Sequence, residues 1–211
     1  MEEEVLKIIN YSLGRKRETF GHGFKSAYHT IKIGDKTIEG QRDIDKRFEN
    51  IDYDFKGKNV IDFGCNIGGM LHKISDDINF GVGLDYNSKV INAANLISTA
   101  NNINNVKFYT FNLDKEKLKI VDSLTLGKKI DVCFVLAIAL WVKRWKEVVE
   151  YCYNISDTLI YESNGDDRFQ LEQQSFLRTL YSDVKLLAEK SMDDNRKDAQ
   201  SKKRMLFICQ K

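Results

Sequence analysis

Residues 57–211 alternate between short β-branched apolar runs and longer stretches with helical periodicity. Seven runs have the length and composition of buried strands, at 60–63, 80–85, 106–111, 130–136, 158–162, 184–189 and 205–209. The spacing of apolar positions between them predicts helices over 68–74, 88–100, 143–152 and 169–181. This alternation is typical of a doubly wound α/β fold, a mainly parallel sheet with helices on both faces.

The first 56 residues follow a different pattern. Their polar and apolar positions predict in turn a helix, a basic loop, a β-hairpin and a second helix, over 2–13, 14–25, 27–39 and 41–51. These elements precede the regular alternation and cannot belong to its strand order. We therefore expect residues 1–56 to form an N-terminal cap or lid, packed on a core domain of residues 57–211.

Composition is that of an ordinary globular chain of one domain, with 211 residues, 42% hydrophobic and 30% charged. The formal net charge of +2 is too small to predict a polyanionic partner from bulk charge. Apolar runs fall well short of the ~20 residues that a membrane span needs. The sequence starts with Met1-Glu2-Glu3-Glu4, which is acidic where a signal peptide is basic. A cytoplasmic location is the expectation.

Metal-binding patterns are weak in this sequence. The four cysteines are widely spaced, without a Cys-x-x-Cys pair or a nearby histidine that would complete a zinc site. We expect them to be reduced, and no metal to be bound. Oxygen ligands for a hard cation follow the strand 158–162, although an acidic turn is the favoured meaning there; these residues are Glu162, Asn164, Asp166 and Asp167.

The first strand of the core leads into a glycine-bearing turn, Asp62-x-Gly64-Cys65-Asn66-x-Gly68. A turn of this kind brings backbone N–H groups close to a ligand, because glycine has no Cβ. The spacing differs from the dinucleotide pattern Gly-x-Gly-x-x-Gly, since Asn66 takes the middle glycine position. Asp62 would repel a pyrophosphate and favours a ligand that carries an ammonium group. An NAD(P)-dependent reductase is disfavoured for both reasons.

This string resembles motif I of the class I S-adenosylmethionine-dependent methyltransferases, in the variant with Asn at the middle glycine. The resemblance covers about residues 57–211 and implies a Rossmann-like fold, an antiparallel end made by the last two strands, and S-adenosylmethionine as cofactor. Asp85 ends the second strand, 23 residues beyond Asp62. An acid at that distance can accept both ribose hydroxyls. The alternative is a surface acid that caps the next helix.

The resemblance assigns further cofactor contacts to residues that follow the other strands. Tyr86 lies beside Asp85, and Asn112 and Asp114 follow the third strand, where the family holds the adenine amino group. Leu136 and the segment 137–141 follow the fourth strand and would pass under the methionine portion. The expected cofactor-binding residues are Asp62, Gly64, Cys65, Asn66, Gly68, Asp85, Tyr86, Asn112, Asp114, Leu136 and Arg42. Arg42, or Arg47, would pair with the cofactor carboxylate or an acidic substrate.

Several subclasses of methyltransferase are disfavoured by motifs that this sequence lacks. The chain has no proline, which excludes the Asn/Asp-Pro-Pro-Tyr motif of amino-directed enzymes. Cys133 lies inside the fourth strand, where it cannot be the nucleophile of a cytosine-C5 enzyme, and no aspartate follows that strand. Direct in-line transfer to an oxygen remains, and a hydroxyl acceptor needs a base. Glu162 and His22 are the favoured candidates, with His29 as a further one.

The sequence thus predicts a methyltransferase that acts on an oxygen of a small molecule or a sugar. One alternative is a tRNA or rRNA methyltransferase, whose basic contacts would be Lys25, Lys197, Lys202, Lys203 and Arg204. Most of these fall in the segment 191–204, which otherwise reads as a solvated loop. Another alternative is a non-catalytic module that binds the nucleoside cofactor.

Overall fold

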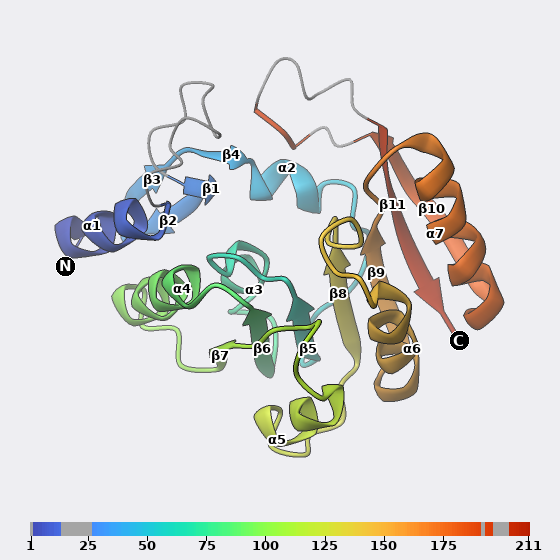
Figure 1. The fold of residues 1–211 in the computed structure, drawn as a ribbon. Helices are drawn as coiled ribbons and strands as arrows, with labels where there is room; N and C mark the ends of the chain where they lie inside the picture. Colours follow the sequence, from blue (N-terminus) through green and yellow to red (C-terminus); the bar gives the residue numbers. More distant parts are fainter. Residues whose placement is uncertain (1, 14–26, 191–192, 196–202) are drawn as a thin grey trace.

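The computed structural model describes residues 2–13, 27–190, 193–195 and 203–211 (Figure 1). A seven-stranded sheet forms its centre, in the order β10-β11-β9-β8-β5-β6-β7. Strands β5 to β9 run parallel, and β11 is antiparallel to both of its neighbours. The strands are β5 (Asn59–Phe63), β6 (Phe80–Asp85), β7 (Val106–Thr110), β8 (Val132–Leu136), β9 (Thr158–Glu162), β10 (Asp183–Lys190) and β11 (Lys203–Gln210). The predicted fold class and antiparallel end are confirmed.

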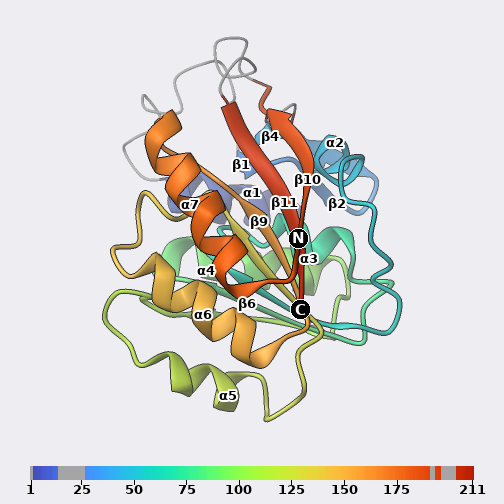
Figure 2. The same ribbon diagram turned by 90° about the vertical axis from the view of Figure 1, so that its right-hand side faces the viewer.

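Helices cover both faces of this sheet (Figures 1 and 2). One face packs against α2 (Ile44–Phe48), α3 (Gly69–Lys73) and α4 (Ser88–Ala100). The other packs against α5 (Val121–Leu124), α6 (Trp145–Ile155) and α7 (Asp167–Leu180). Because both faces are covered, central strands are apolar on both sides, and the sequence shows continuous runs rather than alternation there. The short helix η2 (Leu118–Ile120) and α5 were not predicted.

Caps explain where the longer helices begin. The Asn87 side chain accepts a hydrogen bond from the Lys89 N–H at 3.0 Å and starts α4. The Asp166 side chain accepts one from the Phe169 N–H at 2.8 Å and starts α7, two residues before the predicted start. Such side chains satisfy N–H groups that have no partner inside the helix.

The N-terminal extension differs from the prediction in two places. Its elements are α1 (Glu2–Leu13), β1 (Ala27–His29), β2 (Ile31–Ile33), β3 (Lys36–Ile38) and β4 (Gly40–Arg42), all outside the seven-stranded sheet. The hairpin is confirmed as β2 and β3, but β1 instead pairs with β4 in parallel.

A helix over all of 41–51 is therefore wrong. A Cβ on Gly40 would lie 2.3 Å from the backbone carbon of His29, so that glycine allows β4 to lie directly against β1. The chain turns helical only after Asp43, whose side chain accepts a hydrogen bond from the Lys46 N–H and caps α2.

Residues 193–195, between β10 and β11, join the extension to the sheet. The Asp43 N–H donates to the Asp193 carbonyl at 2.7 Å, and the Asn195 N–H donates to the Gln41 carbonyl at 2.8 Å. An isolated β-bridge links Arg42 with Asp194. On the other side, α1 packs against α4 through an apolar cluster that includes Val5 and Ile97. The extension thus contacts the core in two places, at residues 193–195 and along α4 (Figure 1).

Candidate functional site

The strand order reverses between β5 and β8, which are neighbours in the sheet. From β5 the chain proceeds to β6 and β7 on one side, whereas β8 and β9 extend the sheet on the other. In open α/β sheets a ligand site lies beyond the carboxyl ends of the strands at such a switch point. The turns that follow β5, β6 and β8 meet here, and they contain most of the predicted cofactor residues.

The turn after β5 is built from residues with left-handed backbone conformations. Gly64 has φ 82°, Gly68 has φ 77° and Asn66 has φ 51°. Asparagine is one of the few residues besides glycine that adopt this conformation at low cost, which explains how Asn66 replaces the middle glycine. The N–H groups of Gly64 and Cys65 donate to the Leu84 carbonyl at 2.7 and 3.0 Å and fasten the turn to β6.

Two of the glycines are also required by close packing. A Cβ on Gly64 would lie 2.5 Å from Cγ2 of Ile138, which belongs to the turn after β8. A Cβ on Gly68 would lie 2.4 Å from the ring of Phe108 on β7. The Cβ positions of both glycines are therefore filled by side chains, one from the turn after β8 and one from β7, and glycine allows these side chains to pack directly on the backbone of the turn.

Asp85 ends β6 and faces the glycine turn. Its Oδ2 accepts from the Asn66 N–H at 3.1 Å, and its Oδ1 accepts from the Asn87 N–H at 2.9 Å. Partial burial raises the pKa of this carboxyl above its ordinary value, and the two backbone hydrogen bonds oppose that rise. A carboxylate offers about four acceptor positions, so about two remain for the hydroxyls of a ligand.

Asp62 is buried below the turn, with 2% of its surface exposed. Burial raises the pKa of its carboxyl to about 7; the charge of Arg47 opposes this and that of Asp85 adds to it. A buried carboxyl of this kind gains most from a cationic partner, as the predicted ammonium group would be. Cys65 is also buried, and burial raises the pKa of its thiol well above the ordinary value, so it is not a nucleophile at neutral pH.

Four further predicted residues lie at the same carboxyl edge of the sheet. Tyr86, next to Asp85, is 72% exposed. Asn112 accepts a hydrogen bond from the Asp114 N–H at 3.0 Å and so shapes the turn after β7, while Asp114 is exposed. Leu136, the last residue of β8, is half-buried. Their roles toward a cofactor stay predictions.

Arg42 and Glu162, predicted as a cofactor contact and a base, meet each other in a buried ion-pair cluster. Arg42 is fully buried, and its guanidinium lies 2.9 Å from a Glu162 oxygen and 2.9 Å from an Asp193 oxygen. Asp194 lies 3.4 Å away on the same guanidinium. The Arg42 side chain is thus engaged by carboxylates of the chain itself, and Glu162 is held below the extension.

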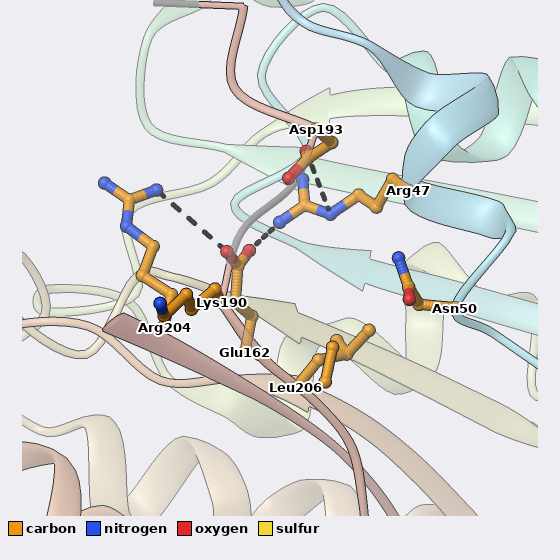
Figure 3. Close-up of a pocket in the computed structure, with 8 residues that line it drawn as sticks. Arg47, Asn50, Glu162, Lys190, Asp193, Arg204 and Leu206 are labelled. Atoms are coloured by element: carbon orange, nitrogen blue, oxygen red, sulfur yellow. Dashed lines mark ion pairs between the residues drawn. The ribbon is translucent and has the colours of Figure 1, made fainter. Parts of the chain in front are cut away.

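Arg47 and Arg204 complete this cluster (Figure 3). Arg47, on α2, pairs with the second oxygen of Glu162, and its Nε lies 3.7 Å from Asp193. Arg204, at the start of β11, lies 4.0 Å from Glu162. We call these six residues the ionic cluster: Arg42, Arg47, Glu162, Asp193, Asp194 and Arg204. They line or adjoin a small cavity with Asn50, Lys190 and Leu206.

His22 and His29 are the two histidines that the sequence suggests as bases. His22 lies outside the described residues. His29, on β1, is buried, and its Nδ1 accepts a hydrogen bond from the Gly69 N–H at 3.3 Å, at the start of α3. Burial, with the charges of Arg47 and Arg42, holds the pKa of His29 well below its ordinary value. The neutral ring therefore joins the extension to the glycine turn.

Sequence reasoning missed a buried polar network behind β9. Ser163, Asn164, Gln170 and Gln173 are all buried. The Ser163 hydroxyl donates to Gln170 at 2.7 Å and accepts from the Met205 N–H at 2.9 Å. Its one visible signal is the pair of glutamines one helical turn apart on α7, directly after the strand that ends at Glu162.

The residues considered for a hard cation have other partners. Asn164 holds backbone groups, Asp166 caps α7, and Asp167 lies 3.7 Å from Lys203. Across the described residues, no group of three or more His, Cys, Asp or Glu side chains is arranged to hold a metal ion. Within the same residues, no helix combines the length and the hydrophobicity that crossing a bilayer requires.

No family model matches the sequence, and no curated protein matches it. The fold, however, is that of Rossmann-like methyltransferases. WbdD in complex with the kinase inhibitor LY294002 aligns with a TM-score of 0.64 at 14% identity, over 92% of this chain and 47% of that chain. WbdD is described as a bifunctional kinase-methyltransferase. The present chain thus spans about half the length of WbdD.

EvdMO1 is a second similar structure, with a TM-score of 0.61 at 10% identity, over 86% of this chain and 43% of that chain. Its N-terminal domain, crystallised in the presence of S-adenosylhomocysteine (SAH) and D-fucose, aligns with a TM-score of 0.60 at 8% identity. That alignment covers 86% of this chain and 89% of the domain. At such identities these similarities establish the fold.

Proposed function

We propose that the protein is an S-adenosylmethionine-dependent methyltransferase that binds its cofactor across the turns after β5, β6 and β8. The observation that carries the proposal is the position of Asp85. Its carboxylate lies 3.1 Å from the Asn66 N–H of the glycine turn, at the switch point, and keeps acceptor positions for two ribose hydroxyls. The similarity in fold to proteins crystallised with SAH supports this assignment.

Other residues at this edge fit the remaining parts of the cofactor. The Asp62 carboxylate would neutralise the ammonium group, and the turn of Gly64, Cys65 and Gly68 would lie beside the amino-acid portion. Asn112 and Asp114 would meet the adenine amino group, and the exposed ring of Tyr86 would cover the base. The bound cofactor supplies a methyl group already activated by its sulfonium. The chain's own task is then to align an acceptor and exclude water.

An oxygen of a small molecule or a sugar is the proposed acceptor. Its support is indirect: the similar N-terminal domain of EvdMO1 was crystallised with SAH in the presence of D-fucose. The base would be His22 or Glu162. Glu162 is paired with Arg42 and Arg47, so it would act only after release from them. Residues 1–56 would form the lid, since β4 and α2 supply these two arginines. A cytoplasmic location stays a prediction.

Ligand binding tests this proposal directly. SAH should protect the protein against thermal unfolding, by ~2.7 kcal/mol at 100 times its dissociation constant, and NAD should not. In calorimetry Asp85→Ala should weaken SAH binding at least tenfold, because both ribose hydroxyls lose their acceptor. Asp157→Ala is the matched control, since that exposed aspartate pairs with Lys129 at the opposite edge of the sheet. Protection by NAD, or undiminished SAH binding by Asp85→Ala, would overturn the proposal.

Transfer of a labelled methyl group to sugars, nucleotide sugars and tRNA would then identify the acceptor class. Methylation of tRNA or rRNA would favour the nucleic-acid alternative, and its binding should weaken steeply with salt as each phosphate contact is lost. Tight SAH binding without transfer to any acceptor would instead favour the non-catalytic module.

A further inference from the structure

One buried side chain holds the turn after β8 at both ends. Asn164 follows β9 and is 4% exposed. Its Oδ1 accepts from the Leu140 N–H at 3.0 Å, and its Nδ2 donates to the Ala137 carbonyl. The two bonds fix which end of the amide faces which group, because one requires an acceptor and the other a donor. Residues 137–140 are therefore closed into a loop across Asn164.

Asn164 is itself fixed by a second buried amide. Gln173, on α7, accepts from the Tyr161 hydroxyl at 2.8 Å and from the Asn164 N–H at 3.3 Å. Its Nε2 donates to the Asn164 carbonyl at 2.7 Å. A buried polar network whose members are all partnered is rigid, since each bond lost leaves an unsatisfied group. The turn after β8 is thus held in place, through Asn164 and Gln173, against β9 and α7.

The turn after β8 contains an energetically unfavourable backbone conformation, and it lies at the candidate site. Ala137 has φ 57°, a conformation that residues with a Cβ adopt rarely, and its N–H donates to the Glu162 carbonyl at 2.8 Å. This directs Ile138 over Gly64, where its Cγ2 takes the place that a glycine Cβ would need. Backbone strain of this kind persists only where the surroundings enforce it. The two hydrogen bonds of the Asn164 side chain hold this conformation in place at the switch point.

We propose that Asn164 is a positioning residue for methyl transfer, which acts by holding the 137–140 turn against the amino-acid end of the cofactor. This inference rests on the proposed function. With the ribose on Asp85 at β6 and the adenine toward β7, the sulfonium end of the cofactor extends toward β8, where Ile138 lies. The turn then forms the wall beside the methyl group. Its last residue, Leu140, and the next residue, Trp141, are both exposed.

A purely structural role for Asn164 predicts a different result from a positioning role. If Asn164 shapes the wall at the sulfonium end, its removal should weaken SAH but not adenosine, which lacks the homocysteine portion. If it only stabilises the fold, both ligands should respond alike. Gln170 offers the matched control, because it is equally buried in the same network but bonds Ser163, Gly165 and Lys203 rather than the turn.

The experiment uses the full chain and titrates SAH, with adenosine measured by displacement of SAH. We expect Asn164→Ala to weaken SAH about tenfold, equivalent to about 1.4 kcal/mol, and adenosine less than twofold. Gln170→Ala should change both by less than twofold. Equal weakening of both ligands by Asn164→Ala would overturn the positioning role. Absence of SAH binding by the unaltered chain would instead overturn the proposed function itself.

A second experiment measures the mobility of the turn after β8 in the absence of any ligand. In a Trp145→Phe background Trp141 is the remaining tryptophan, and its nanosecond fluorescence anisotropy reports the motion of the segment. Asn164→Ala should increase the fast component, and Gln170→Ala should leave it unchanged. Should Asn164→Ala fold poorly, Asn164→Asp keeps the acceptor for Leu140 but places an oxygen against the Ala137 carbonyl. An unchanged anisotropy in both Asn164 variants would contradict the proposal.

Discussion

The glycine turn, which is partly buried, and the ionic cluster, which is mostly buried, are built from different polar groups. At the turn, backbone N–H groups of consecutive residues meet one carbonyl and one carboxylate, Leu84 and Asp85. In the ionic cluster, three arginines and three carboxylates meet from four separate parts of the chain. The first region depends on the absence of a Cβ, and the second depends on the pairing of buried charges.

This difference determines how each region responds to change. Backbone groups remain when a side chain is replaced, so the turn is sensitive mainly to added volume. A buried charge that loses its partner keeps its desolvation cost, so the cluster is sensitive mainly to the removal of one member. The first kind of damage should appear chiefly in cofactor binding, and the second chiefly in stability.

The largest expected effect is on the ionic cluster. Arg42→Met would remove the guanidinium that contacts all three carboxylates, and should cost about 3–5 kcal/mol in the free energy of unfolding, measured with urea. Arg204→Met is the control, because its 4.0 Å contact with Glu162 is long and its side chain is partly exposed, which predicts a much smaller loss. Equal losses in the two variants would show that stability does not depend on the short ion pairs of Arg42.

A smaller effect is expected at the glycine turn. Gly64→Ala combines a left-handed backbone with a contact to Ile138 at 2.5 Å, and should cost about 2–4 kcal/mol through strain and overpacking. Gly127→Ala is the matched control, since Gly127 has φ 66° but no neighbour within 4 Å of its would-be Cβ. SAH affinity should fall only in Gly64→Ala. A similar loss of stability in both variants would assign the whole cost to backbone conformation.

The effect expected at Asp62 depends on pH and disappears in acid. Its pKa is about 7 in the folded protein and 3.8 in the unfolded chain, so between these values the folded state binds more protons. Stability should therefore fall as pH rises from about 4 to 7. Asp62→Asn removes this loss and should be more stable than the unaltered chain by up to about 4 kcal/mol at pH 8, at ~1.4 kcal/mol per pKa unit, with no gain at pH 4. Thermal unfolding at the two pH values measures the difference.

The same group gives the opposite dependence for binding. A cationic ammonium favours the charged Asp62, so SAH binding should release a proton and strengthen as pH rises through about 7. Calorimetry in buffers of different ionisation enthalpy detects that proton. In Asp62→Asn both the proton release and the pH dependence should disappear, and a persistent dependence would assign it to another group.

The sequence predicted the elements whose formation depends mainly on residues that are close together in the chain. The seven strands and four of the helices between them were readable because apolar periodicity reflects burial on one or both faces. The turn at Gly64, Asn66 and Gly68 was readable because left-handed backbone positions restrict the residues that can occupy them. The helix expected over 41–51 failed because Gly40 allows β4 to contact His29, a contact that periodicity does not encode.

The sequence by itself determined the doubly wound fold, the position of the glycine turn and the placement of Asp85 at the end of the second core strand, since each depends on neighbours along the chain. Only the tertiary structure decided that Arg42 meets Glu162, 120 residues away, and that Asn164 holds the turn after β8. The physical reason is the range of the interactions. A backbone conformation or an apolar periodicity is encoded within a few residues, whereas the partner of a buried charge or amide is set by which strands the fold makes adjacent.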